Sequence, residues 1–175
     1  MSVSAPLENI DLHSFIFTPT TESFPTALIL LNSTSPSSSL PFLRAVRRSA
    51  SLCIAADGAA GRLYRSIITS VDGVSVGENS PPSLEAIAAL NSQLPNIVCG
   101  DWDSIDKESE SFYRAAGCTM IADPDDQDST DLMKCLREVK RRQICEGTRY
   151  RVIVYGAFGG RFDHEAQNLN CLYIW

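Results

Sequence analysis

Basic residues are missing from the first quarter of the chain, where no lysine or arginine precedes Arg44. A secretory signal starts with a positively charged segment and many organellar transit peptides are rich in arginine, so the sequence predicts neither. Long apolar runs are missing too, and the longest early one covers only residues 27–31. A membrane-spanning helix needs about 20 apolar residues. We therefore expect a cytoplasmic protein without a membrane span.

Metal-binding patterns based on histidine and cysteine are also lacking. The only histidines are His13 and His164, and the six cysteines include no Cys-x-x-Cys pair, so a zinc site is not expected. Several cysteines lie inside apolar runs, which predicts buried free thiols in a reducing compartment.

A positive net charge is absent as well, because the formal charge of the 175 residues is −6. This argues against binding to nucleic acid or to an anionic membrane, both of which favour a basic surface. It is compatible with ATP, which acidic proteins bind through a metal and a few local cations. An apolar fraction of 44% and a charged fraction of 21% fit a soluble globular domain.

Two common nucleotide-binding motifs do not occur: Gly-x-x-x-x-Gly-Lys-Ser/Thr and Gly-x-Gly-x-x-Gly. P-loop and dinucleotide-binding folds therefore lose support. The acidic segment 123–131 is not an EF-hand, because Asp128 or Asp131 stands where such a loop requires glycine.

The chain does contain short apolar runs that alternate with helix-like segments. Buried strands are predicted at 26–31, 52–56, 96–99, 118–122 and 151–155. Helices are predicted at 40–49, from within 57–64, and at 81–90, 107–116, 129–143 and 164–174. The alternation predicts an α/β fold: a doubly wound, mostly parallel sheet with helices on both faces, in three Rossmann-like layers. Residues 1–25 are expected to form a loosely ordered arm before one domain, 26–175.

Polar clusters follow the ends of four predicted strands, at 57–62, 100–104, 123–131 and 156–163. The carboxyl ends of parallel strands share one edge of the sheet, where α/β proteins bind ligands. We therefore expect the four clusters to meet in one crevice.

Aspartates dominate two of these clusters. Asp101 and Asp103 are the first metal-ligand candidates, and Asp126, Asp128 and Asp131 are the second group. Carboxylates suit Mg²⁺, which usually accompanies phosphates. The alternative for the second group is that it only caps the following helix, with Asp128 or Ser129 as N-cap. For Asp131 the ligand role is favoured.

Lys134 lies one helical turn after Asp131 and could bind a phosphate beside it. The glycine-rich segment 156–163 offers backbone amides, those of Gly159 and Gly160 among them, together with Arg161 and Asp163. This favours an anion site over the alternative of a glycine-rich turn with a surface ion pair between Arg161 and Asp163.

Two further residues allow a functional and a structural interpretation. His164 is expected at the start of a helix more than as a catalyst. Trp102, between the two acids, could stack on a base or ring, and packing against the protein is an equal alternative.

The segments 56–60, 100–105, 126–135 and 156–165 occur in an order that resembles the catalytic domain of eukaryotic thiamine pyrophosphokinase, over roughly 26–173. The resemblance implies Mg²⁺-dependent transfer of a diphosphate from ATP to thiamine, which gives thiamine diphosphate and AMP. It also implies a homodimer.

By motif position, the resemblance implies that Asp101, Asp103 and Asp131 hold Mg²⁺ and the ATP phosphates. Arg161 would join them in catalysis by offsetting phosphoryl charge. The nucleotide or cofactor site is expected to comprise Asp57, Gly58, Asp128, Lys134, Gly159, Gly160, Arg161 and Asp163. Lys134 is included on its spacing alone. Either Asp101 or Asp103 would accept the proton of the thiamine hydroxyl.

The sequence departs from the family pattern in two places. Ala59 and Gly61 replace the usual glycine and asparagine of the first block. Relatives also continue past residue 173 into a β-sandwich domain that contributes to the dimer and the thiamine site, so we expect a C-terminally truncated form with a weakened or lost dimer.

The alternative function is therefore a non-catalytic form that binds Mg-nucleotide or a full-length partner and exposes apolar surface near its last helix. An unrelated Asp-x-Asp phosphohydrolase or sugar transferase is a third hypothesis, for which the ordered blocks leave little room.

Overall fold

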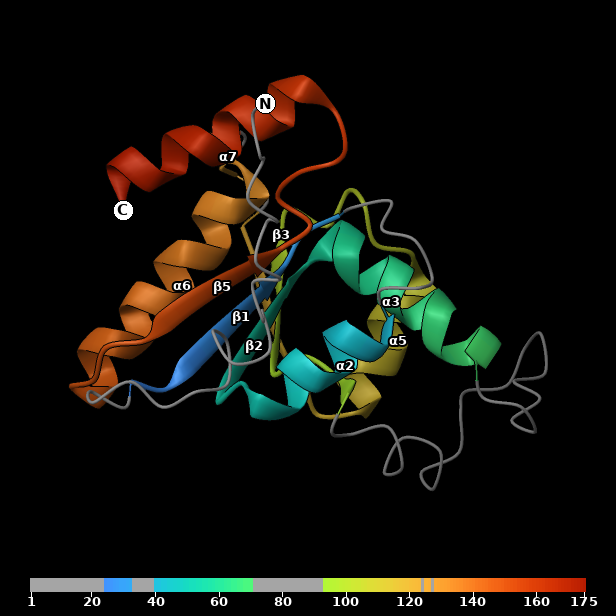
Figure 1. Cartoon of the computed structure of the whole chain (residues 1–175). Helices are drawn as coiled ribbons and strands as arrows, with labels where there is room; N and C mark the ends of the chain where they lie inside the picture. Colours follow the sequence, from blue (N-terminus) through green and yellow to red (C-terminus); the bar gives the residue numbers. More distant parts are fainter. Residues whose placement is uncertain (1–23, 33–39, 71–92, 124, 127) are drawn as a thin grey trace, which may run out of the picture.

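The computed structural model describes residues 24–32, 40–70, 93–123, 125–126 and 128–175 (Figure 1). Nearly all of the expected N-terminal arm and the helix expected at 81–90 lie outside these residues.

Five strands form one sheet in which every pairing is parallel, in the order β4-β3-β2-β1-β5. The strands are β1 (Thr26–Leu30), β2 (Leu52–Ala56), β3 (Ile97–Gly100), β4 (Thr119–Ala122) and β5 (Arg151–Tyr155). Each lies within one residue of an apolar run in the sequence, because strands covered on both faces are apolar throughout. β1, β2 and β3 are buried along their whole length, whereas the edge strands β4 and β5 are partly exposed.

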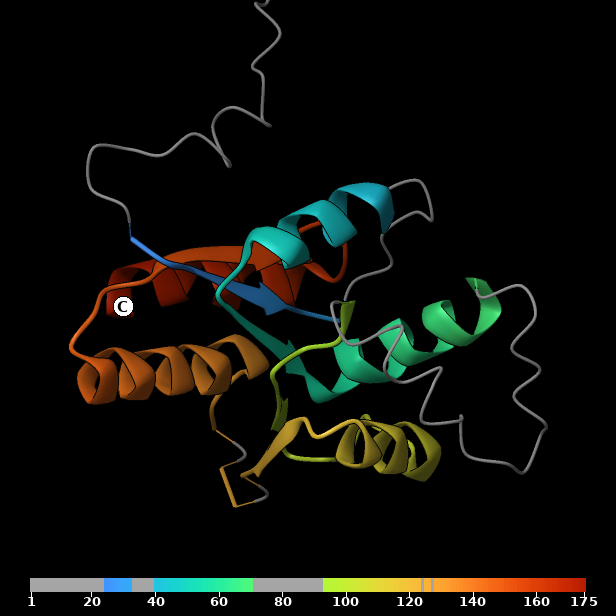
Figure 2. The ribbon, with the colours of Figure 1, turned by 90° about the horizontal axis from the view of Figure 1, so that it is seen from below.

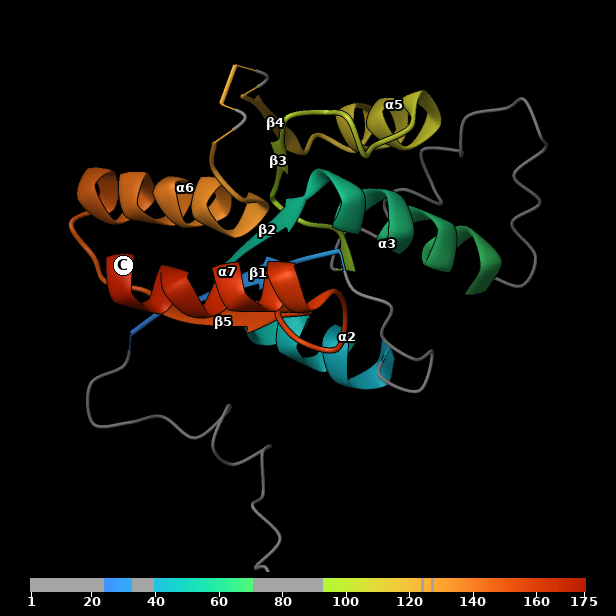
Figure 3. The same cartoon turned by 90° about the horizontal axis from the view of Figure 1, so that it is seen from above.

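The helices that connect these strands cover both faces of the sheet. They are α2 (Leu40–Ser49), α3 (Asp57–Ser70), α5 (Lys107–Ala115), α6 (Asp131–Glu146) and α7 (Phe162–Ile174). In Figure 2 and Figure 3, α2, α3 and α5 lie on one side of the sheet and α6 and α7 on the other. The predicted doubly wound α/β fold is confirmed.

The chain reverses its direction across the sheet between β4 and β5. It steps outward from β1 through β2 and β3 to β4, and α6 then returns it to β5 on the far side of β1. Because crossovers between parallel strands are right-handed, this reversal places α6 on the opposite face. The neighbours β1 and β5 thus form the topological switch point, where such sheets bind ligands.

The longest helix differs from its prediction at both ends. Thr130, not Asp128 or Ser129, is the N-cap of α6, and its hydroxyl accepts a hydrogen bond from the amide of Met133. The helix ends at Glu146, where Gly147 adopts a left-handed backbone with φ of 64°. His164 lies in the first turn of α7, as predicted.

The hydrophobic core fills both sides of the sheet, with Leu28, Ile54, Tyr64, Tyr113 and Val139 among its fully buried side chains. All six cysteines are free thiols, and four are buried, which confirms the prediction for these: Cys53, Cys99, Cys135 and Cys171. Across the described part of the chain, no helix is both long and apolar enough to cross a membrane.

Candidate metal and nucleotide site

Three carboxylates meet beside the carboxyl ends of β2 and β3. Asp57 is the first residue of α3 and follows β2 directly, while Asp101 and Asp103 follow β3. One oxygen of each lies within 4.8 Å of the other two. Because β2 and β3 are parallel neighbours, residues 40 or more positions apart in the chain leave the sheet at the same edge.

Asp57 is held firmly in this cluster. It is 1% exposed and accepts hydrogen bonds from the amides of Gly58 (2.6 Å) and Trp102 (3.0 Å). Burial raises its pKa, and the charge of Asp101 adds to this, while the two amide bonds act in the opposite direction. Gly100 permits the approach, because a Cβ at that position would lie 2.5 Å from Cγ of Asp57.

The N-terminal turns of α6 add one more acid and one cation. Nζ of Lys134 lies 3.1 Å from Oδ2 of Asp101, and the lysine side chain is 2% exposed. Burial, the largest single influence, works against ionisation of Asp101, but the hydrogen bond and charge of Lys134 and the hydrogen bonds with Asp103 together outweigh it and lower the pKa of this carboxyl. Lys134 thus serves as a buried partner of the acidic cluster in this structure.

Asp131 belongs to the same electrostatic cluster. Burial raises its pKa to about 6, and the negative charges of Asp57 and Asp101 add to the shift, with Lys134 opposing it. Of the predicted ligands, Asp101 and Asp103 thus meet directly, with Asp57 as the third carboxylate, and Asp131 interacts with them through its charge. Carboxylate oxygens arranged in this way suit a hard divalent cation such as Mg²⁺.

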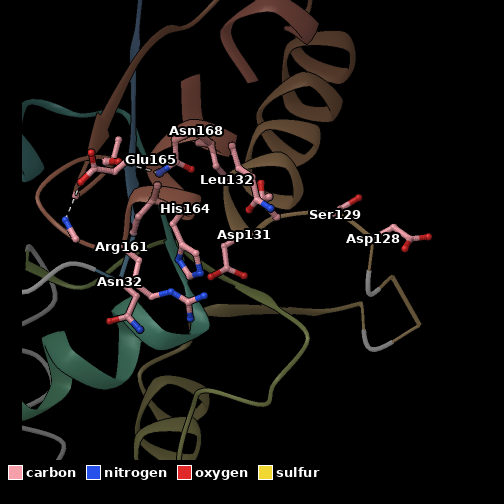
Figure 4. A pocket seen from close by; sticks show the side chains of 15 residues that line it. Asn32, Asp128, Ser129, Asp131, Leu132, Arg161, His164, Glu165 and Asn168 are labelled. Atoms are coloured by element: carbon pink, nitrogen blue, oxygen red, sulfur yellow. Dashed lines mark hydrogen bonds between the residues drawn. The ribbon is translucent and has the colours of Figure 1, made fainter. Parts of the chain in front are cut away.

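A pocket of about 270 Å³ lies at the switch point, between the ends of β1 and β5 and the first turns of α6 and α7. Its lining includes Asn32, Asp131, Gly160, Arg161 and His164. Figure 4 shows Asp131, Arg161 and His164 directed into one hollow, with Asp128 at its outer side. Asp131 lines this pocket, and its charge interacts with those of Asp57 and Asp101, which are not among the lining residues.

The backbone amides of the glycine-rich loop before α7 already bind a carboxylate side chain of the protein. The amides of Gly159 and Gly160 both donate to Oε1 of Glu165, at 2.8 and 2.9 Å. A phosphate bound to these amides must therefore replace the Glu165 carboxylate. Arg161 lies 2.5 Å from Asp163, which is the surface ion pair named above as the alternative.

Asp126 has a structural role outside the cluster. It accepts from the amide of Ser129 and pairs with Arg137. Hydrogen bonds with Ser129 and Arg137 lower its pKa to about 2. For this member of the second aspartate group, the structure shows a contact with the segment just before α6, while the N-cap of the helix is Thr130.

The comparisons with known proteins place this site in a family. Residues 43–175 match the family model described as the catalytic domain of thiamin pyrophosphokinase. The chain belongs to the thiamine pyrophosphokinase family. It is 35% identical over 148 residues to thiamine pyrophosphokinase 1 of Arabidopsis thaliana, which covers 84% of this chain and 50% of that protein. It is also 35% identical over 150 residues to thiamine pyrophosphokinase 2 of Oryza sativa, a match that covers 85% of this chain and 51% of that protein.

The chain thus spans about half the length of these thiamine pyrophosphokinases. Among solved structures, the yeast thiamin pyrophosphokinase matches with a TM-score of 0.65 and 22% identity, covering 99% of this chain and 62% of that one. The thiamin pyrophosphokinase from Candida albicans matches with a TM-score of 0.59 and 20% identity, and the match covers 86% of this chain and 53% of that one. At identities of 20–22%, these two structures support the α/β fold of this chain and nothing beyond it.

Sequence reasoning missed some residues of this thiamine pyrophosphokinase domain. Asn32 follows β1, lines the pocket and accepts a hydrogen bond from Arg62. Asn168 fixes α7 to the glycine-rich loop by donating to the carbonyl of Ala157 at 2.9 Å. A polar residue directly after a buried strand was the available signal for Asn32, whereas no local pattern marks Asn168 or Glu165.

Proposed function

We propose that this chain carries the Mg²⁺ and nucleotide site of a thiamine diphosphokinase, which transfers a diphosphate from ATP to thiamine and releases AMP. Family membership supports the reaction class. The observation that carries the proposal is the meeting of Asp57, Asp101 and Asp103 within 4.8 Å, beside a switch-point pocket that Asp131 lines.

Asp101, Asp103 and Asp131 would hold the Mg²⁺, and the position of Asp57 adds a fourth carboxylate to this set. The metal, when bound, neutralises charge on the phosphate oxygens. Arg161 and the glycine-rich loop would bind phosphate oxygens, together with Gly58, Gly159 and Gly160. Asp128 lines the same pocket and Asp163 pairs with the pocket residue Arg161, and both would complete the nucleotide site.

The chemistry needs little beyond positioning and charge neutralisation. The thiamine hydroxyl oxygen forms a bond to the β-phosphorus of ATP, the bond from that phosphorus to the oxygen bridging it to the α-phosphorus breaks, and AMP leaves. We assign the hydroxyl proton to Asp103, because Asp101 is already engaged by the Lys134 ammonium. We infer from the family resemblance that the full assembly is a homodimer.

The test is a coupled assay for AMP formation with the purified, folded chain. AMP formation should require both thiamine and Mg²⁺, and Asp101→Asn should lower the rate by about a hundredfold, the order found for one electrostatic group in an active site. Asp126→Asn is the matched control, since Asp126 pairs with Arg137 outside the cluster, and its rate should stay near that of the unaltered chain.

A folded chain that forms no thiamine-dependent AMP would contradict catalysis by this form. Calorimetric titration with a non-hydrolysable ATP, with and without Mg²⁺, then tests the second candidate, a non-catalytic form that binds Mg-nucleotide. The exposed apolar residues on α7 favour this candidate, because exposed apolar patches commonly mark surfaces that bind another part of a protein or a partner.

A further inference from the structure

Trp102 has a backbone conformation that is rare for a residue with a side chain. Its φ is 71°, and among the described residues it is the only one other than glycine with a positive φ. A Cβ clashes with the neighbouring carbonyl in this left-handed region, so other interactions must hold the residue there. The residue lies between two members of the acidic cluster, Asp101 and Asp103.

The backbone of Trp102 is tied to the third member. Its amide donates to Oδ2 of Asp57 at 3.0 Å, which requires the chain to turn back toward β2 directly after Asp101. The turn continues into Asp103, whose amide donates to Oδ1 of Asp101 at 3.4 Å. The left-handed residue therefore lies where the loop folds its two carboxylates toward Asp57.

The indole of Trp102 is clamped against α5. It is half-buried against the hydrophobic core, and Cζ of Arg114 lies 5.9 Å from its ring centroid. Arg114 is in turn held by Glu110, at 2.7 and 3.0 Å. The buried Nε1 has no hydrogen-bond partner among the described residues, so packing and the guanidinium keep the indole in place.

We propose that Trp102 is a positioning residue of the metal site, in which the clamped indole holds the left-handed turn that brings Asp101 and Asp103 to Asp57. This inference rests on the proposed function of the acidic cluster as a divalent-metal site. Trp102 makes two contributions, the packing of its indole against the core and Arg114 and the left-handed conformation of its backbone. Substitutions can change each of them separately.

Three variants distinguish the contributions. Trp102→Phe keeps a ring under Arg114 and should bind Mn²⁺ within about twofold of the unaltered chain. Trp102→Ala loses the clamp and keeps the steric cost of the turn, so it should bind most weakly. Trp102→Gly also loses the clamp but removes the steric cost, so it should bind about fivefold more tightly than Trp102→Ala.

A site that does not need the left-handed backbone at residue 102 predicts a different order. Glycine gives the unfolded chain more freedom than alanine, so Trp102→Gly would then be the less stable variant and would bind no more tightly. The measurement is calorimetric titration with Mn²⁺, with urea unfolding of the same samples. If Trp102→Ala fails to fold, the pair Trp102→Asn and Trp102→Leu replaces it, because asparagine tolerates the left-handed region and leucine does not.

The outcomes separate this inference from the proposed function. Binding by the unaltered chain, with equal affinities for the Ala and Gly variants, overturns the role of Trp102 and leaves the metal site standing. An unaltered chain that binds no Mn²⁺ overturns the metal site. In that case the urea unfolding midpoints still test the left-handed turn, because the turn predicts that Trp102→Gly is more stable than Trp102→Ala.

Discussion

Gly100, the last residue of β3, lies so close to Asp57 that no side chain fits there. In Gly100→Ala the added Cβ would meet Cγ of Asp57 at 2.5 Å and would force this buried carboxylate out of the cluster. We expect a loss of about 1–3 kcal/mol in the free energy of unfolding, as for other overpacked sites, together with a loss of divalent-metal affinity. Urea unfolding and Mn²⁺ titration measure the two effects.

Gly61→Ala is the matched control. Gly61 lies in α3, and the nearest atom to an added Cβ is 3.6 Å away, at the end of the flexible Arg65 side chain. Alanine favours a helix over glycine by about 1 kcal/mol, so this variant should be as stable as the unaltered chain or more stable. Equal behaviour of the two variants would contradict a tight approach at Gly100.

Helices α3 and α5 pack through an aromatic group with one polar contact. The Tyr64 hydroxyl donates to Oε1 of Glu108 at 2.7 Å, and the Tyr64 ring lies 4.9 Å from that of Phe112. Burial, followed by the bond to Glu108, raises the pKa of Tyr64 to about 12. The phenol of the unfolded chain ionises near pH 10, so the folded state keeps its proton over a range in which the unfolded state loses it.

The stabilising contribution of the neutral Tyr64 phenol is therefore fully present below pH 10 and is lost as the pH rises to about 12. The loss should reach about 2–3 kcal/mol. Tyr64→Phe should be less stable than the unaltered chain at pH 7, by about 1 kcal/mol for the lost hydrogen bond, and should show a flatter decline above pH 10. Tyr173→Phe, which alters a side chain that is 90% exposed, is the control and should leave the decline unchanged.

The elements were the most predictable part of the fold. Apolar runs placed all five strands to within one residue at most ends, because burial on both faces dictates their composition. Because the predicted strands are parallel, the sequence also placed the aspartates that follow them at one edge of the sheet. The left-handed turn at Trp102, the pairing of Lys134 with Asp101 and the contact of Glu165 with Gly159 and Gly160 were not predictable, because each depends on the distance between segments that only the folded chain brings together.

At the scale of the whole molecule, the end of α7 exposes an apolar surface. Its members, with exposed fractions from 47% to 90%, are Leu169, Leu172, Tyr173, Ile174 and Trp175. The expected apolar surface near the last helix is thus confirmed. We expect the 175-residue chain to bind a hydrophobic dye and to associate as its concentration rises, because such patches are seldom left in water.

Leu172→Glu should weaken both effects, and analytical ultracentrifugation with dye fluorescence measures them. Ile144→Glu is the matched control, because Ile144 is equally exposed, at 74%, but lies on α6 outside this surface. A chain that stays monomeric and binds no dye would contradict an exposed apolar surface at the end of α7 in solution.

Ligand binding should stabilise the molecule as a unit. At a concentration of Mg-ATP about 100 times its Kd, linkage adds about 2.7 kcal/mol to the free energy of unfolding, which corresponds to a rise in Tm of roughly 5–10 °C. Removal of Mg²⁺ with EDTA, or Asp101→Asn, should abolish most of the rise in thermal unfolding. An equal rise in EDTA would show that the nucleotide binds without the acidic cluster.

The pairing of β1 with β5 has a consequence for how the protein reaches its native state. Thr26 and Arg151 are partners in the ladder although they are 125 positions apart, whereas β1 and β2 are joined by a short crossover. Closing so long a loop is slow and requires that β5 has already been synthesised. The strands β1 to β4 can assemble earlier on the ribosome, so the pocket between the ends of β1 and β5 is expected to form later than the rest of this sheet.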